Sequence, residues 1–62
     1  MTKREMITEM IDGLNYAGGN KRVIDNRCNA RKERVTEVYN FYQTTGKTKE
    51  DKTFCINLLT KF

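Results

Sequence analysis

Apolar residues recur every three or four positions through most of this chain, which is the spacing of one face of an α-helix. The first such stripe comprises Met6, Ile7, Met10, Ile11, Leu14 and Ala17. The sequence Thr2-Lys3-Arg4-Glu5 precedes it and forms a capping box, in which the Thr2 hydroxyl and the Glu5 carboxylate bind free backbone N–H groups. Gly18 and Gly19 follow the stripe and are typical of a helix end. The pattern predicts a first helix over residues 2–17.

The second stripe is the longest and comprises Ile24, Cys28, Val35, Val38, Tyr39 and Tyr42. Asn20 is a suitable N-cap before it, Gly46 is a suitable stop after it, and no proline interrupts it. A coiled-coil register, in which the spacing alternates between four and three, is formed by Ile24, Cys28, Arg31, Val35, Val38 and Tyr42, with Arg31 as its one polar member. We therefore expect one continuous helix over residues 20–44. The alternative is a break near Asn26–Asn29, which would give two helices.

The third stripe comprises Phe54, Cys55, Leu58, Leu59 and Phe62. It follows Thr48-Lys49-Glu50-Asp51, a second capping box with Asp51 in place of the usual Glu or Gln. The prediction is a helix over residues 48–61, and with it an all-α, three-helix domain spanning residues 1–62. The positions expected to be buried are Met6, Met10, Leu14, Ile24, Val35, Val38, Tyr42, Leu58 and Leu59.

The lengths of these helices bear on assembly. At 1.5 Å per residue the middle helix would be roughly 36 Å long and its neighbours roughly 21–24 Å, so part of its apolar stripe would stay uncovered. A chain of 62 residues also has a thin core, which oligomerisation commonly supplements. We therefore expect a homodimer or a higher oligomer.

Composition argues against several kinds of chemistry. The chain has two cysteines and no histidine, which is too few ligands for a zinc site and too few thiols for a disulfide framework. Neither Cys28 nor Cys55 has a histidine to activate it as a nucleophile, so we expect no enzymatic activity and no cofactor or small-molecule substrate. No apolar run approaches the ~20 residues of a membrane span. Free thiols and the lack of a signal-peptide pattern favour a cytoplasmic protein.

Charge provides the main functional signal. The net charge is +4 and the sequence pI is about 9.3, which favours anionic partners. Arg27, Arg31 and Arg34 are spaced to lie along one edge of the middle apolar stripe, where guanidinium groups can contact a partner. Phe41 lies outside the centre of that stripe and would mark a partner surface if it is exposed. The candidate partner-binding residues are Arg27, Arg31, Lys32, Arg34 and Phe41.

Three classes of function agree with this pattern. The first in rank is a small interaction protein, a regulator or inhibitor that docks its Arg-rich helix face onto an acidic partner. Chains of this size and composition are typical of phage accessory proteins. The second is a nucleic-acid-binding protein that contacts phosphates through the basic middle helix. The third is a purely structural homo-oligomer whose basic residues only solvate the surface.

The state of the middle helix separates the first two classes. A break near Asn26–Asn29 would create a helix-turn-helix whose second helix starts with Arg31, Lys32 and Arg34, a geometry suited to reading a DNA groove. An unbroken helix lacks that element and favours the interaction protein, which is why the interaction protein ranks first.

Overall fold

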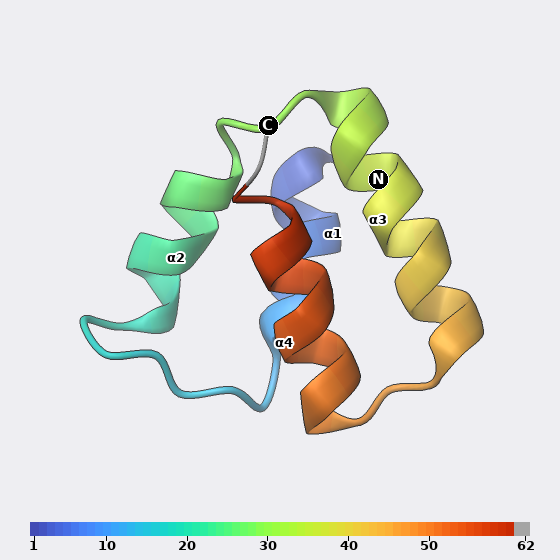
Figure 1. Ribbon diagram of the computed structural model, residues 1–62. Helices are drawn as coiled ribbons and strands as arrows, with labels where there is room; N and C mark the ends of the chain where they lie inside the picture. Colours follow the sequence, from blue (N-terminus) through green and yellow to red (C-terminus); the bar gives the residue numbers. More distant parts are fainter. Residues whose placement is uncertain (61–62) are drawn as a thin grey trace.

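The structure is a computed structural model that describes residues 1–60, and it is built from helices alone over that range. The helices are α1 (Lys3–Ile11), α2 (Asn20–Arg27), α3 (Lys32–Thr45) and α4 (Lys49–Leu58). In Figure 1, α4 lies in front of α1, with α2 on one side of this pair and α3 on the other. The prediction of an all-α fold is confirmed, whereas the prediction of three helices is wrong, because residues 1–60 form four.

The first helix is shorter than predicted. It begins as expected, because the Thr2 side chain accepts a hydrogen bond from the backbone N–H of Glu5 and the capping box is complete. It ends at Ile11, well before the glycine pair, because Gly13 adopts a positive φ of +84° that a helix cannot continue. Leu14 is still buried, but from the connection between α1 and α2, where its carbonyl accepts a hydrogen bond from the Asn20 side chain.

The middle segment is not one helix. It breaks between Arg27 and Lys32, where successive backbone hydrogen bonds such as Ala30 N–H to the Arg27 carbonyl (3.0 Å) close a tight turn. Ala30 is fully buried in this joint, and Arg31 is exposed at the N-cap of α3. The predicted coiled-coil register with Arg31 inside it is therefore wrong. A break lets the second half of the apolar stripe reach the rest of the core, which one long helix would not allow.

The break does not produce a compact helix-turn-helix. Both α2 and α3 pack against α1, and they lie on opposite sides of the α1–α4 pair (Figure 1). Consequently α2 is not placed to brace α3 against DNA as the first helix of that motif does. We expected an oligomer because a long middle helix would extend beyond its neighbours. No such helix is present in the described residues, which fill a compact volume of 27 × 24 × 21 Å.

The core lies between α1, α3 and α4, with one buried residue, Ile24, from α2. Eight of the nine positions expected to be buried are buried, and Leu58 is half-buried instead. Helix α4 begins after Thr48, whose side chain accepts a hydrogen bond from Asp51 N–H as predicted (3.2 Å). It ends at Leu58, short of the predicted residue 61, and the expected apolar position at Phe62 lies outside the described residues.

Candidate interaction surface

The three arginines predicted to form one stripe do not share a helix face, because the break separates Arg27 from the other two. Arg27 is half-buried, and its Nε donates a hydrogen bond to the carbonyl of Ile56 near the end of α4 (3.2 Å). The last carbonyls of a helix lack partners within it, so a guanidinium there stabilises the helix end. Arg27 therefore ties α2 to α4.

Two lysines have comparable internal roles, which sequence reasoning missed. Lys3 Nζ donates hydrogen bonds to the carbonyls of Cys28 (2.8 Å) and Ala30 (3.0 Å), so it spans the joint between α2 and α3. Lys52 Nζ donates to the carbonyl of Asp12 (2.6 Å), just beyond the end of α1. A lysine on an amphipathic helix has the same sequence pattern whether it solvates the surface or binds a distant carbonyl, so no sequence signal could have identified these contacts.

An ion pair also joins α1 to α2. Arg4 pairs with Asp25, and Lys21 lies 3.5 Å from the other oxygen of the same carboxylate. The hydrogen bond from Arg4 lowers the pKa of Asp25 below its ordinary value. Both side chains are about half exposed, so the pair positions α2 more than it stabilises the fold.

The remaining predicted cations are closer to solvent. Arg31 and Lys32 are exposed at the start of α3. Arg34 is half-buried, and its Nη1 lies 3.4 Å from Oε1 of Glu37 one turn later. These three residues are the part of the predicted basic set that can meet a partner.

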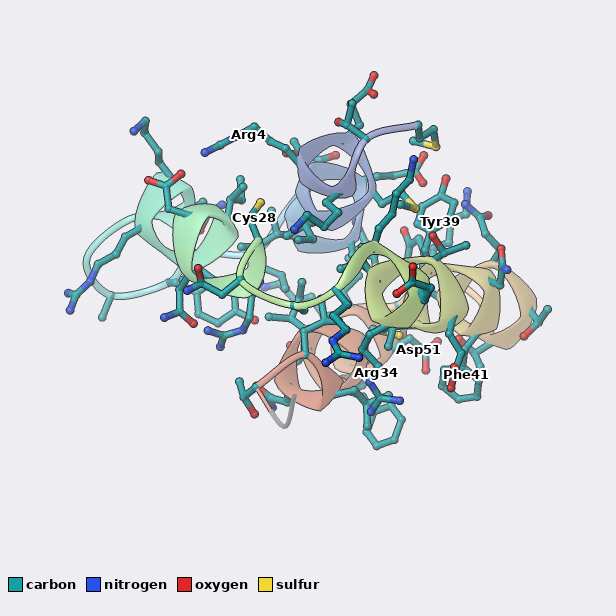
Figure 2. All side chains as sticks on the ribbon, turned by 90° about the horizontal axis from the view of Figure 1, so that it is seen from above. Arg4, Cys28, Arg34, Tyr39, Phe41 and Asp51 are labelled. Carbon is teal, nitrogen blue, oxygen red and sulfur yellow. The ribbon has the colours of Figure 1, made fainter. Side chains whose placement is uncertain are left out.

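Phe41 is exposed, as the sequence-based hypothesis required, and it has an aromatic neighbour. Its ring lies 5.9 Å from that of Phe54, centroid to centroid, with the planes tilted by 54°. The exposed fractions are 44% for Phe41 and 54% for Phe54, and within residues 1–60 only Met1 is a comparably exposed large apolar residue. Figure 2 shows Phe41 projecting from α3 away from the centre of the molecule. Phe54 was predicted to lie on the apolar face of its helix and was not recognised as a site residue.

A groove adjoins this pair between α3 and α4. It has a volume of about 380 Å³ and is lined by Val38, Phe41, Phe54 and Leu58, with Arg34 and Glu37 at its edge. We call these six residues the aromatic face. A second hollow, of about 400 Å³, lies on the other side of Phe54 against the polar residues of α4. Phe54 is thus a ridge between two depressions, which makes its ring accessible from both sides.

The two tyrosines near Phe41 do not belong to this face. Tyr42 is buried, in agreement with a packing role. Tyr39 is half-buried on the side of α3 that meets α1, where a hydrogen bond with Glu9 raises the pKa of its hydroxyl. Gln43 donates a hydrogen bond to the same carboxylate (3.1 Å). This side of α3 is therefore occupied by contacts within the molecule.

Groups that could support catalysis or metal binding are few in the described part of the chain. Cys55 is buried, and burial raises the pKa of its thiol, which keeps it protonated. Over residues 1–60 no three His, Cys, Asp or Glu side chains gather as metal ligands would. Within the same residues, no helix has the length and apolar character needed to cross a membrane.

Comparison of the chain with protein-family models, with curated proteins and with solved structures finds no match.

Proposed function

We propose that this chain is a small, non-enzymatic interaction protein, a regulator or inhibitor that docks its aromatic face onto an acidic partner protein. The observation that carries the proposal is the exposed pair of Phe41 and Phe54 beside the α3–α4 groove. Clustered aromatic side chains provide most of the binding energy in protein interfaces, whereas scattered exposed apolar residues need no explanation. Two phenylalanines in contact, from different helices and with a groove between them, form such a cluster.

Charge supports an acidic partner. Arg34 lies at the edge of the groove, and Arg31, three positions earlier, extends the basic character toward the start of α3. The Arg34 guanidinium contacts Glu37 only loosely, at 3.4 Å, and the Glu37 side chain is 74% exposed. An exposed pair of this kind contributes little to stability, so Arg34 can exchange it for a partner carboxylate in a bidentate arrangement.

Nucleic-acid binding remains the second candidate, because the middle segment does break, which was only the alternative to the predicted continuous helix. The arrangement gives it less support than the sequence did. Arg27 binds a carbonyl of α4, and α2 and α3 do not form the compact motif.

Site-specific photo-cross-linking tests the proposal. A benzophenone side chain placed at position 54 should form an adduct with an acidic protein in cells that produce the chain, and nuclease treatment should not remove it. The matched control carries the same group at Asn15, which is exposed in the connection between α1 and α2. The Phe41→Ala variant should weaken the position-54 adduct.

Other outcomes would contradict the proposal. An adduct sensitive to nuclease would indicate the nucleic-acid-binding class. An adduct with twice the mass of the chain would indicate that a second copy covers the aromatic face. Equal labelling from positions 54 and 15 would show that the face has no specific partner.

A further inference from the structure

The α3–α4 pair is covered on one side and open on the other. These helices run antiparallel, joined by residues 46–48, and α1 packs against both of them (Figure 1). The side chains that α1 contributes to this contact are the apolar stripe of Met6, Ile7, Met10 and Ile11. The aromatic face offers a further groove between the same two helices, and there it meets solvent.

The form of this groove restricts what can fill it. Both walls are helices, whose backbone hydrogen bonds are made internally, so no strand edge is present there to pair with an extended peptide. Recognition therefore depends on side chains. The groove between neighbouring helices accepts a third helix, whose side-chain ridges pack between theirs at an interaxial distance of about 8–10 Å.

The distribution of charge restricts the occupant further. Val38 and Leu58 provide an apolar floor, and Phe41 and Phe54 provide apolar walls. The edge carries one cation, Arg34, and one anion, Glu37, which lies one turn farther along α3. Arg31 is exposed beyond Arg34 toward the start of α3. A ligand that fills the groove with apolar side chains and places carboxylates near Arg34 and Arg31 would match both features.

From the proposed docking function, on which this step rests, we infer that the aromatic face receives one amphipathic, acidic α-helix of the partner. Its apolar residues recur at three- and four-residue intervals and pack between Phe41, Phe54 and Leu58. Its carboxylates lie near Arg34 and Arg31, toward the start of α3, and an uncharged or basic residue lies beside Glu37. The partner helix would pack on the open side of the α3–α4 pair, as α1 does on the covered side.

Three synthetic peptides of 18 residues test this inference. The first is a helix with leucine at positions 4, 8, 11 and 15 and a polar face containing glutamate. The second has lysine in place of every glutamate, and the third is a scrambled acidic peptide with no apolar stripe. The acidic amphipathic peptide should bind at least tenfold more tightly than either of the others. Backbone amide NMR shifts should change in α3 from its start to about Phe41 and in α4 around Phe54 and Leu58.

Variants of the protein locate the effect. Phe54→Ala should weaken binding of the acidic peptide at least tenfold and keep the helical circular-dichroism spectrum, because this ring is largely exposed. Met1→Ala is the matched control, since it removes an exposed apolar side chain elsewhere and should leave the affinity unchanged. Arg34→Gln should reduce the difference in binding affinity between the acidic and the basic peptide, because it removes the cation at the groove edge.

The outcomes separate this inference from the function on which it rests. Equal affinity for the acidic and basic peptides would overturn the acidic character of the occupant. NMR shift changes confined to α1 and α2 would show that the peptide helix does not bind at the aromatic face. If no peptide binds while position 54 still cross-links to an acidic protein, the helical occupant is wrong and the docking function stands. If no peptide binds and position 54 forms no specific adduct, both the docking function and the helical occupant are wrong.

Discussion

Helix α2 and the α3–α4 pair are held in the molecule by different kinds of interaction. Helix α2 has one buried residue, Ile24, and one partly buried apolar residue, Val23, that packs against the core. Polar contacts also hold this helix in place. Lys3 binds the carbonyls that follow it, Arg4 pairs with Asp25, and Arg27 reaches a carbonyl of α4. The α3–α4 pair instead contributes most of the apolar core outside α1. Its buried residues are Val35, Val38, Tyr42, Cys55, Ile56 and Leu59.

This difference shows which part of the molecule can support binding. Regions with few buried apolar contacts open locally more easily than the core. Helix α2 is therefore expected to show the fastest amide hydrogen exchange of the four helices in residues 1–60. The hydrogen bonds and the ion pair that hold it can be replaced by hydrogen bonds to water. The aromatic face lies on the better-packed pair, and a rigid surface loses less conformational entropy when a partner binds.

The largest expected change in stability comes from replacing one of two adjacent leucines at the end of α4. Leu59→Ala should lower the free energy of unfolding by about 2–5 kcal/mol, because Leu59 is fully buried and a cavity would remain. Leu58→Ala is the matched control and should cost less than about 2 kcal/mol, because Leu58 is half-buried at the groove. Urea denaturation measures both. Equal losses would show that the groove side of α4 is packed as tightly as the core side.

Removing a tether should affect α2 selectively. Lys3→Met keeps an unbranched side chain but removes the ammonium that binds the Cys28 and Ala30 carbonyls. Hydrogen bonds to a charged group contribute roughly 1.5–3 kcal/mol, and a cation at a helix N-terminus is slightly unfavourable, so a net loss of about 1–2 kcal/mol is expected. Hydrogen exchange should accelerate most in α2. Lys32→Met, at an exposed position, should change stability by at most about 0.5 kcal/mol.

Tyr16, in the connection that leads to α2, should give a smaller effect of opposite sign. Its hydroxyl is buried and has no hydrogen-bond partner among residues 1–60. Removing an unsatisfied buried group avoids its desolvation penalty, so Tyr16→Phe should stabilise the fold by about 1 kcal/mol. Tyr39→Phe is the control, because the Tyr39 hydroxyl interacts with Glu9 and its removal should bring no gain. Thermal denaturation distinguishes the two variants.

Acid should weaken the tether of α2 by a small amount. Arg4 lowers the pKa of Asp25 in the folded protein, so the ionised carboxylate stabilises the fold at pH values above about 4. That contribution is lost as the pH falls through the lowered pKa. The stability difference between the wild-type protein and Asp25→Asn should therefore shrink below pH 4. A difference that grows in acid would contradict the assigned direction.

The sequence predicted those features that depend on near neighbours. Both threonine caps, the end of α3 at Gly46 and the burial of Val35, Val38 and Tyr42 follow from residues within a few positions of one another. The break after Arg27 could not be predicted from neighbouring residues, because no glycine or proline marks it and the apolar spacing continues across it. It depends instead on the burial of Ala30 and on the Lys3 ammonium, 25 and 27 positions away along the chain from the carbonyls it binds.

Sequence reasoning identified only part of the candidate site, because the rest depends on contacts between residues far apart in the chain. The position of Phe41 outside the centre of its stripe predicted a partner surface if the ring were exposed, and it is exposed. Phe54 was placed on the apolar face of the third helix because of its spacing, yet more than half of its surface is exposed. Only the packing of α3 against α4 brings these two rings together. Arg27 lies apart from Arg31 and Arg34, because the break leaves it at the end of α2 and its Nε bonds to α4.

The dissociation constant of the partner recovered by cross-linking, measured for matched variants, tests the docking face most directly. Truncation of an interface hot spot costs about 2 kcal/mol or more, so Phe54→Ala should raise this constant roughly thirtyfold. The double variant Arg31→Gln/Lys32→Gln should change it less and mainly reduce its dependence on salt. An unchanged affinity for Phe54→Ala, together with loss of binding in the double variant, would contradict the assignment and place the contact on the basic start of α3.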